Sequence, residues 1–186
     1  MDSIYSALIP TAASEVRIEI AQVLESFGES VLSIVANSGA LIRPLRPRER
    51  YADASSALCR LGIDVDAWPA PPAGLFVVEE RTVYLRSRSP MTIAHEFGHA
   101  IDCALADGVY LSGSNPEIRR AFSEARSFVT PYAATGLDEY FAESVRAYVE
   151  VNDANSSWPH ASKVRLRRVD AAMYRIVESL LLDCAT

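Results

Sequence analysis

Residues 95–99 of this 186-residue chain read His-Glu-Phe-Gly-His, and their types and spacing suggest chemistry more directly than any other part of the sequence. On an α-helix, positions i and i+4 lie on one face, so His95 and His99 can both direct an imidazole to the same metal ion. Glu96 then lies beside that ion. This pattern is typical of zinc hydrolases.

The flanking residues predict that this motif lies inside a helix over residues 89–105. Ser89 is a good N-cap, and Pro90 fits the first helical position, where no backbone N–H is needed. Apolar residues occupy most of the helix circumference, which leaves the two histidines and Glu96 as buried polar groups that need partners. A zinc ion would provide them. The alternative is a pair of core histidines bonded to carbonyl groups, with Glu96 in a salt bridge.

A catalytic zinc site needs a third protein ligand. The metzincin extension is excluded, because Asp102 and Leu105 stand where that motif requires Gly and His. His160 follows Pro159 in a stretch that reads as a loop. A glutamate from a second helix, predicted over residues 138–150, is the better candidate.

In that second helix Glu139 and Glu143 share one face. Glu139 can bind the zinc directly, while Glu143 can accept the free ring N–H of a liganding histidine. Asp102 is a further candidate for such an outer contact. A capping box of Thr135 and Asp138 is expected to start the helix. The alternative, a solvated acidic face, is disfavoured because much of the helix is apolar.

Two segments of the sequence, one in each predicted helix, resemble a known family. HEFGHAID at residues 95–102, followed by EYFAES at residues 139–144, is similar to the catalytic domain of anthrax lethal factor and its relatives, which include the clostridial Pro-Pro endopeptidases. These are zinc metallopeptidases of the gluzincin type. The resemblance covers roughly residues 74–150, and residues 1–70 show no motif of the family.

The resemblance implies that His95, His99 and Glu139 bind one zinc ion and that Glu96 is the general base. The expected activity is hydrolysis of peptide bonds in a peptide or protein substrate. In such a reaction zinc polarises the scissile carbonyl and acidifies water, and Glu96 takes the proton of that water and passes it to the leaving amine.

The family also has a tyrosine seven residues before the liganding glutamate, where it stabilises the transition state. Tyr132 occupies that position relative to Glu139. The resemblance therefore implies that the Tyr132 hydroxyl donates to the developing oxyanion. Tyr110 and His160 are the alternative donors.

The expected fold is α+β and zincin-like, mostly helical, with a small mixed sheet. Residues 74–78 and 82–85 are rich in β-formers and are separated by charged residues, which predicts a hairpin. Zincins place an edge strand just ahead of the active-site helix, so residues 83–86 are expected to form an edge that can pair with a peptide. The alternative is an ordinary hairpin that closes the core.

Length and composition favour one domain over residues 1–186, with an N-terminal part (1–70), a catalytic core (74–150) and a C-terminal helix (160–183). Further elements are read from periodicity and from Pro and Gly. They are helices over 14–36, 51–61, 115–128 and 161–182, the last long or broken, a strand over 40–45, and a loop over 68–74.

Charge and cysteine content limit the partners and the compartment. A net charge of −6 argues against nucleic acid and weakly favours basic peptide segments. No apolar run is long enough for a membrane span. Three cysteines without a framework spacing suggest a reducing compartment or incidental buried thiols. No classical signal peptide is visible, so residence in the cytoplasm or export by a dedicated route is expected.

Two other functions remain open at this stage. An intracellular regulatory protease that cleaves a repressor would use the same site, but no helix-turn-helix or sensor module is visible in residues 1–70. A zinc-stabilised binding module without catalysis would need four protein ligands and no general base. The substrate and the oligomeric state are not encoded in any motif.

Overall fold

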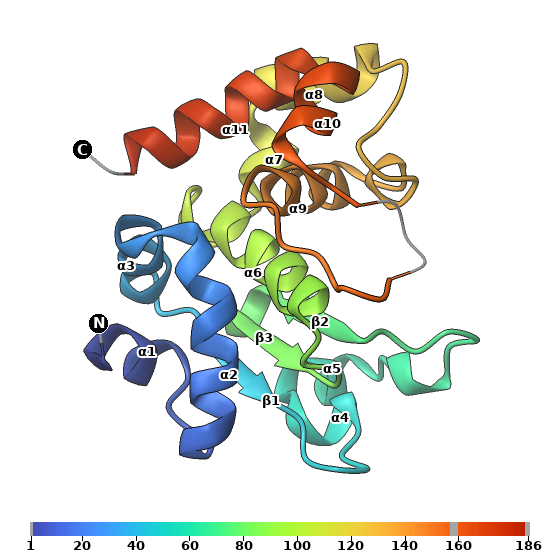
Figure 1. Ribbon diagram of the computed structural model, residues 1–186. Helices are drawn as coiled ribbons and strands as arrows, with labels where there is room; N and C mark the ends of the chain where they lie inside the picture. Colours follow the sequence, from blue (N-terminus) through green and yellow to red (C-terminus); the bar gives the residue numbers. More distant parts are fainter. Residues whose placement is uncertain (1, 157–159, 185–186) are drawn as a thin grey trace.

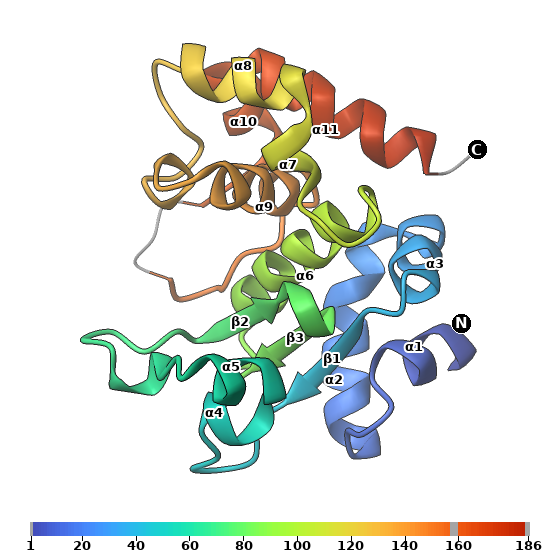
Figure 2. The same ribbon diagram turned by 180° about the vertical axis from the view of Figure 1, so that it is seen from behind.

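The computed structural model describes residues 2–156 and 160–184, in which helices surround one small three-stranded sheet (Figure 1). Helix α6 (Pro90–Ala104) runs through the middle of the molecule. The sheet and the helices α1 to α5 lie on one side of it, and α7 to α11 lie on the other, as the view from behind also shows (Figure 2). The predicted α+β fold, mostly helical with a small mixed sheet, is therefore confirmed.

The sheet has the strand order β1-β3-β2. Strand β2 (Gly74–Val77) and strand β3 (Thr82–Leu85) form the predicted antiparallel hairpin. Strand β1 (Leu41–Pro44) pairs in parallel with the other side of β3, with Leu41 opposite Thr82. The prediction that residues 83–86 form an edge is therefore wrong: β3 is central, and β2 is the edge strand that lies beside α6.

Several predicted helices are shorter than expected, because a residue with non-helical backbone interrupts them. Gly28, at φ 81°, separates α2 from α3. Ser55 and Asp170 each end one helix and cap the next, since their side chains accept hydrogen bonds from Leu58 N–H and Met173 N–H. The bounds are α1 (Asp2–Leu8), α2 (Ser14–Leu24), α3 (Glu29–Asn37), α4 (Tyr51–Ala54), α5 (Ser56–Leu61), α7 (Leu111–Ser114), α8 (Pro116–Glu124), α10 (Lys163–Val169) and α11 (Ala171–Asp183).

The two helices that carry the motif residues begin differently. Helix α6 starts as predicted, with Ser89 Oγ accepting from Thr92 N–H and Pro90 in the first turn. Helix α9 (Leu137–Tyr148) starts after Gly136 and has no side-chain cap. The predicted capping box is therefore wrong. Thr135 Oγ1 instead donates to the carbonyl of Tyr132, which belongs to a preceding 3₁₀ turn.

Helices α6 and α9 pack closely because Gly98 has no side chain. A Cβ built on Gly98 would lie 2.9 Å from Ala142 Cα, which is backbone of the facing helix and cannot move independently. The neighbouring residues in sequence, Phe97 and Phe141, are both buried in the main core. Glycine at this position thus sets the distance between the two helices.

Other sequence-based expectations concern the whole chain. Cys59, Cys103 and Cys184 are free thiols. None of the described helices combines the length and the apolar character that crossing a membrane requires. The single-domain organisation remains a prediction.

Replacing Gly98 with Ala tests the helix contact. The added methyl forces α6 and α9 apart, which costs about 2 kcal/mol, while the better helix propensity of Ala returns about 1 kcal/mol. The melting temperature should fall by roughly 2–4 °C. Gly113→Ala is the control, because a Cβ there meets no atom within 4 Å and should leave the melting temperature unchanged or raise it. A Gly98→Ala protein as stable as the wild type would contradict this account.

Candidate metal centre

The motif histidines of α6 direct the same ring atom to one point. His95 Nε2 and His99 Nε2 lie 3.2 Å apart, one helical turn from each other, and both side chains are buried. In the described part of the chain, no ring nitrogen of His95 or His99 is bonded to a carbonyl group. The geometry therefore does not show the alternative of core histidines bonded to carbonyl groups.

Helix α9 brings Glu139 to the same point. Its Oε2 lies 3.0 Å from His95 Nε2 and 3.4 Å from His99 Nε2. This oxygen is buried and accepts no hydrogen bond of acceptable geometry in the described part of the chain. An orphaned carboxylate oxygen facing two imidazole nitrogens is a group that a cation would satisfy.

The spacing of these three atoms fits zinc. Ligand atoms at about 2.0–2.2 Å from a tetrahedral zinc lie about 3.3–3.6 Å from one another, and the three atoms here are separated by 3.0 to 3.4 Å. Two imidazoles and one carboxylate also match the donor set of catalytic zinc sites. Among the described residues, His95, His99 and Glu139 form a group of side chains that could hold a metal ion.

Glu143, one turn further along α9, orients His95. Its Oε1 lies 2.9 Å from His95 Nδ1, so the ring donates from Nδ1 and keeps Nε2 free for a metal. Thr130 Oγ1 donates to Oε2 at 2.5 Å. Burial acts to raise the pKa of Glu143, but the hydrogen bonds from His95 and Arg146 outweigh it and hold that pKa well below its ordinary value.

Arg146 is a residue of this network that sequence reasoning missed. Its side chain is fully buried and donates to both Glu143 oxygens, from Nε at 2.9 Å and from Nη2 at 2.8 Å. Its Nη1 donates to the Val151 carbonyl and to Asn152 Oδ1. The i, i+3 spacing of Glu143 and Arg146 is the signal that could have indicated the pair.

Asp102, the further predicted outer contact, and His160, an alternative oxyanion donor, both lie elsewhere. The Asp102 carboxylate accepts from Ser112 N–H at 2.8 Å and from Ser112 Oγ at 2.6 Å, and so ties the end of α6 to α7 rather than to a histidine ring. Burial raises the pKa of Asp102 to about 6. His160 is exposed and does not belong to the metal-ligating group.

Tyr132 lies at the mouth of the site. Its hydroxyl donates to Glu139 Oε1 at 3.0 Å, and its ring centroid is 5.4 Å from that of His95. Burial and the neighbouring Glu139 raise the pKa of this phenol, which therefore stays protonated at neutral pH. Tyr110, the alternative donor, lies deeper, with its ring 5.7 Å from that of His99.

Glu96 is buried between α6 and the edge strand β2. A Cβ at Gly74 would lie only 2.5 Å from Glu96 Cγ, so glycine is what lets the strand approach this carboxylate. Burial raises the pKa of Glu96, while His95 and His99 act in the opposite direction. These residues border a cleft of about 250 Å³. Its walls are Pro72, Ala73, Gly74, Met91, Thr92, His95, Glu96, Tyr132, Glu143 and Arg146.

Comparison with known proteins is informative at the level of fold. No protein-family model matches the chain, and no curated protein matches it in sequence. Among solved structures, the chain shares its fold with a protein of known structure. One such structure is the Pro-Pro endopeptidase PPEP-2 from Paenibacillus alvei, which matches with a TM-score of 0.65 and 20% identity over 95% of this chain and 99% of that one. The predicted resemblance is thus confirmed for the fold.

The metal content of variants tests the ligand set. The wild-type protein should bind one zinc ion per chain. Glu139→Ala should lose tight zinc binding, whereas Glu143→Ala should weaken it by roughly 10–100-fold, since it removes only the partner of His95. His160→Ala is the control and should bind zinc as the wild type does. Zinc retained by Glu139→Ala but released by Glu143→Ala would reverse the two roles.

Proposed function

We propose that the protein is a zinc-dependent endopeptidase. The observation that carries this proposal is the convergence of His95 Nε2, His99 Nε2 and Glu139 Oε2 within 3.4 Å of one another, beside the buried Glu96 and an open cleft. The zincin-like fold and the peptidase activity named for PPEP-2 support it.

The edge strand β2 is the proposed binding surface for an extended substrate. Among the described strands β2 pairs only with β3, so its other side is available for backbone hydrogen bonds to a peptide. Gly74 and Phe76 lie against Glu96 on that side. A peptide paired with β2 would pass directly over the carboxylate and the metal-ligating atoms.

The residues of the chain have distinct proposed roles in hydrolysis. His95, His99 and Glu139 would hold a zinc ion, and that ion would supply Lewis acidity to polarise a carbonyl group and acidify water. Glu96 accepts the proton of the attacking water and returns it to the leaving amine, a task that suits a carboxylate whose pKa is raised by burial. The Tyr132 hydroxyl, at the open side, donates to the carbonyl oxygen as it gains negative charge.

A purely structural zinc site is the alternative, and the geometry disfavours it. Structural sites have four protein ligands, whereas three ligating side chains converge here in the part of the chain that the structure describes. The cleft beside them leaves room for water and substrate.

Cleavage of a peptide library tests the proposed function, with Glu96→Gln as the decisive variant. The wild type with zinc should cleave library peptides, and a chelator should abolish cleavage. Glu96→Gln should keep the zinc ion and the melting temperature, because the three ligands remain, yet lose hydrolysis with the general base. Undiminished turnover in this variant would show that another group activates the water.

Tyr132→Phe separates a transition-state donor from a packing residue. Only a hydroxyl is lost, and 42% of the side chain is exposed, so zinc content and melting temperature should barely change. If the hydroxyl meets the oxyanion, kcat should fall by roughly 10²–10³-fold. A variant with the wild-type rate and a lower melting temperature would instead assign Tyr132 to packing.

A further inference from the structure

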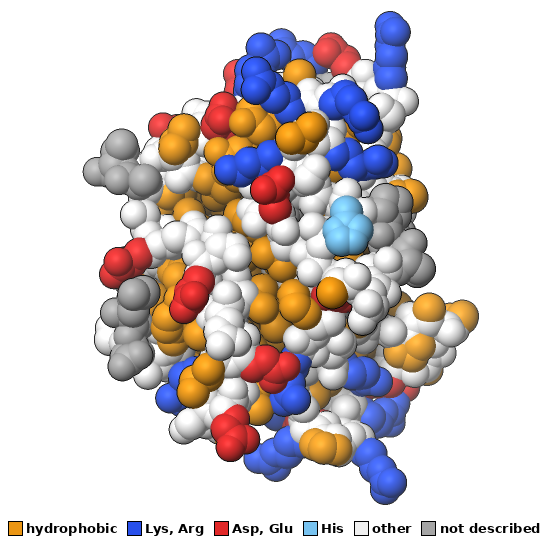
Figure 3. All heavy atoms as spheres, viewed as in Figure 1, with side chains coloured by type: hydrophobic (Ala, Val, Ile, Leu, Met, Phe, Trp, Pro, Cys, Tyr) orange, Lys and Arg blue, Asp and Glu red, His pale blue; other side chains and the backbone are white. Residues whose placement is uncertain are grey.

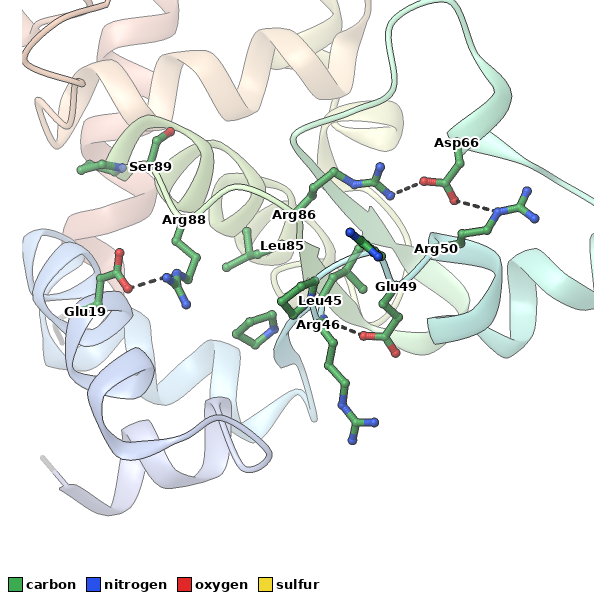
Figure 4. Close-up of a pocket in the computed structure, with 14 residues that line it drawn as sticks. Glu19, Leu45, Arg46, Glu49, Arg50, Asp66, Leu85, Arg86, Arg88 and Ser89 are labelled. Carbon is green, nitrogen blue, oxygen red and sulfur yellow. Dashed lines mark hydrogen bonds and ion pairs between the residues drawn. The ribbon is translucent and has the colours of Figure 1, made fainter.

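A second, larger cleft lies at the end of the sheet where the parallel strands β1 and β3 both terminate (Figure 4). Its volume is about 790 Å³, within the range of ligand-binding clefts. Its walls are the segments that follow these strands, residues 44–50 and 85–90. Lys and Arg side chains gather over this lower end of the molecule in the space-filling view (Figure 3), as they also do at the upper end.

The cleft is basic, although the chain has a net charge of −6. The charged groups in its walls leave an excess of two positive charges. They comprise five arginines, Arg46, Arg48, Arg50, Arg86 and Arg88, and three carboxylates, Glu19, Glu49 and Asp66.

Each of the three carboxylates already has an arginine partner. Glu19 pairs with Arg88 at 3.1 Å. Asp66 receives hydrogen bonds or ion pairs from Arg86 and Arg50, which converge on it from two sides (Figure 4). These carboxylates are therefore neutralised and do not repel an incoming anion.

Glu49 is also neutralised, since Arg43 pairs with it at 2.6 Å from outside the cleft. Two arginines remain without an ion-pair partner in the described residues, Arg46 and Arg48. Both are exposed, and the Arg46 side chain extends away from the acidic groups drawn in Figure 4. Arg48 has a left-handed backbone at φ 67°, a conformation that costs energy for a residue with a side chain.

The cleft lacks the features that bind a nucleotide or a free phosphate tightly. No aromatic residue stands in its walls to stack a base. The start of α6 is nearby, but its first free N–H groups are occupied, since Met91 N–H donates to Asp153 and Thr92 N–H donates to Ser89. What remains is an open groove with prolines, leucines and unpaired guanidinium groups, which suits the carboxylates of an extended chain.

The basic cleft and the catalytic cleft share a wall. The Ala73 carbonyl accepts from Arg86 N–H and Ser87 N–H, and Ala73 itself borders the catalytic cleft. On the side of α6, Pro90 belongs to the basic cleft and Met91 to the catalytic one. A peptide that leaves the catalytic cleft at this end meets the arginines next.

We propose that this basic cleft binds an acidic segment of the peptide substrate, to one side of the bond that is cleaved. The proposal rests on the proposed peptidase function and adds a substrate preference to it. Arg46 and Arg48 are the specificity-determining residues, because their charges are not neutralised within the protein. The overall negative charge disfavours acidic peptides in general, so the basic cleft is the feature that would admit an acidic segment beside the catalytic cleft.

Binding without chemistry is the first test. A fluorescein-labelled Ala₃-Glu₆-Ala₃ peptide and its Ala₃-Gln₆-Ala₃ counterpart are titrated with the Glu96→Gln protein, and fluorescence anisotropy is measured. The Glu peptide should bind roughly threefold to tenfold more tightly, as two exposed ion pairs allow. The preference should shrink as salt is added. Equal binding of the two peptides overturns the proposal.

A charge-matched pair of variants locates the effect. Arg46→Glu/Arg48→Glu breaks no ion pair and should abolish or reverse the preference for the Glu peptide. Arg126→Glu/Arg168→Glu changes the net charge by the same amount at exposed arginines far along the chain, and should keep the preference. A preference that survives the first pair, or is lost with the second, overturns the assignment to this cleft.

Cleavage is the second test and separates this proposal from the proposed function. Three Glu or three Gln residues are added beyond either end of a library peptide that the wild type cleaves. At one end Glu should lower KM by roughly threefold to tenfold and leave kcat unchanged, and Arg46→Glu/Arg48→Glu should remove this difference. Equal KM values overturn the proposal. If no library peptide is cleaved, the proposed function fails, while the anisotropy measurement still decides whether the cleft prefers acidic peptides. Inorganic pyrophosphate that displaces the Glu peptide completely at equal concentration would identify a small-anion site instead and also overturn it.

Discussion

The site depends on one close contact, the approach of the α6 backbone to α9 at Gly98 and Ala142. The three proposed ligand atoms come from both helices, and each is held by a short side chain or a single ring. A separation greater by even a fraction of an ångström would move Glu139 Oε2 away from the two imidazoles. The residue between the two motif histidines thus determines whether they have a third partner, which gives a physical role to a position that the motif leaves open.

The second constraint is electrostatic. Glu96, Glu139 and Glu143 are three acidic side chains packed around two histidines, and burial alone would favour their neutral forms. Arg146 supplies one positive charge from within the protein. Burial acts to lower the pKa of His95, yet the nearby carboxylates of Glu139 and Glu143 outweigh it and raise that pKa to about 10. A proton on His95 and a metal ion are therefore alternative ways to balance the same carboxylates, and they compete for Nε2.

Short-range sequence patterns predicted the helix that carries the two histidines. Ser89 and Pro90 fixed the start of α6, and the i, i+4 spacing placed His95 and His99 on one face. The strand order of the sheet was not predicted correctly. Strand β1 pairs in parallel with β3, and the paired residues, such as Leu41 and Thr82, are about forty positions apart in the sequence. No turn signal marks such a pairing, so β3 was expected at the edge. The helix breaks at Gly28, Ser55 and Asp170 were not predicted, because the apolar pattern of each predicted helix continues on both sides of the break. Arg146 escaped notice since a charged residue on a helix is usually solvated, and only burial shows its role.

The parallel pairing of β1 with β3 affects substrate recognition as well as the topology of the sheet. It brings the carboxyl ends of β1 and β3 together and creates the basic cleft there, while it leaves β2 as the free edge beside Glu96. Arg86 connects the two, since its side chain lies over the Tyr51 ring at 4.6 Å and its backbone holds Ala73. Tyr51 in turn donates to the Pro72 carbonyl. The segment that enters the edge strand is thus anchored by Arg86, which lines the basic cleft, and by Tyr51 beneath its guanidinium group, so a peptide bound along both clefts would contact one continuous wall.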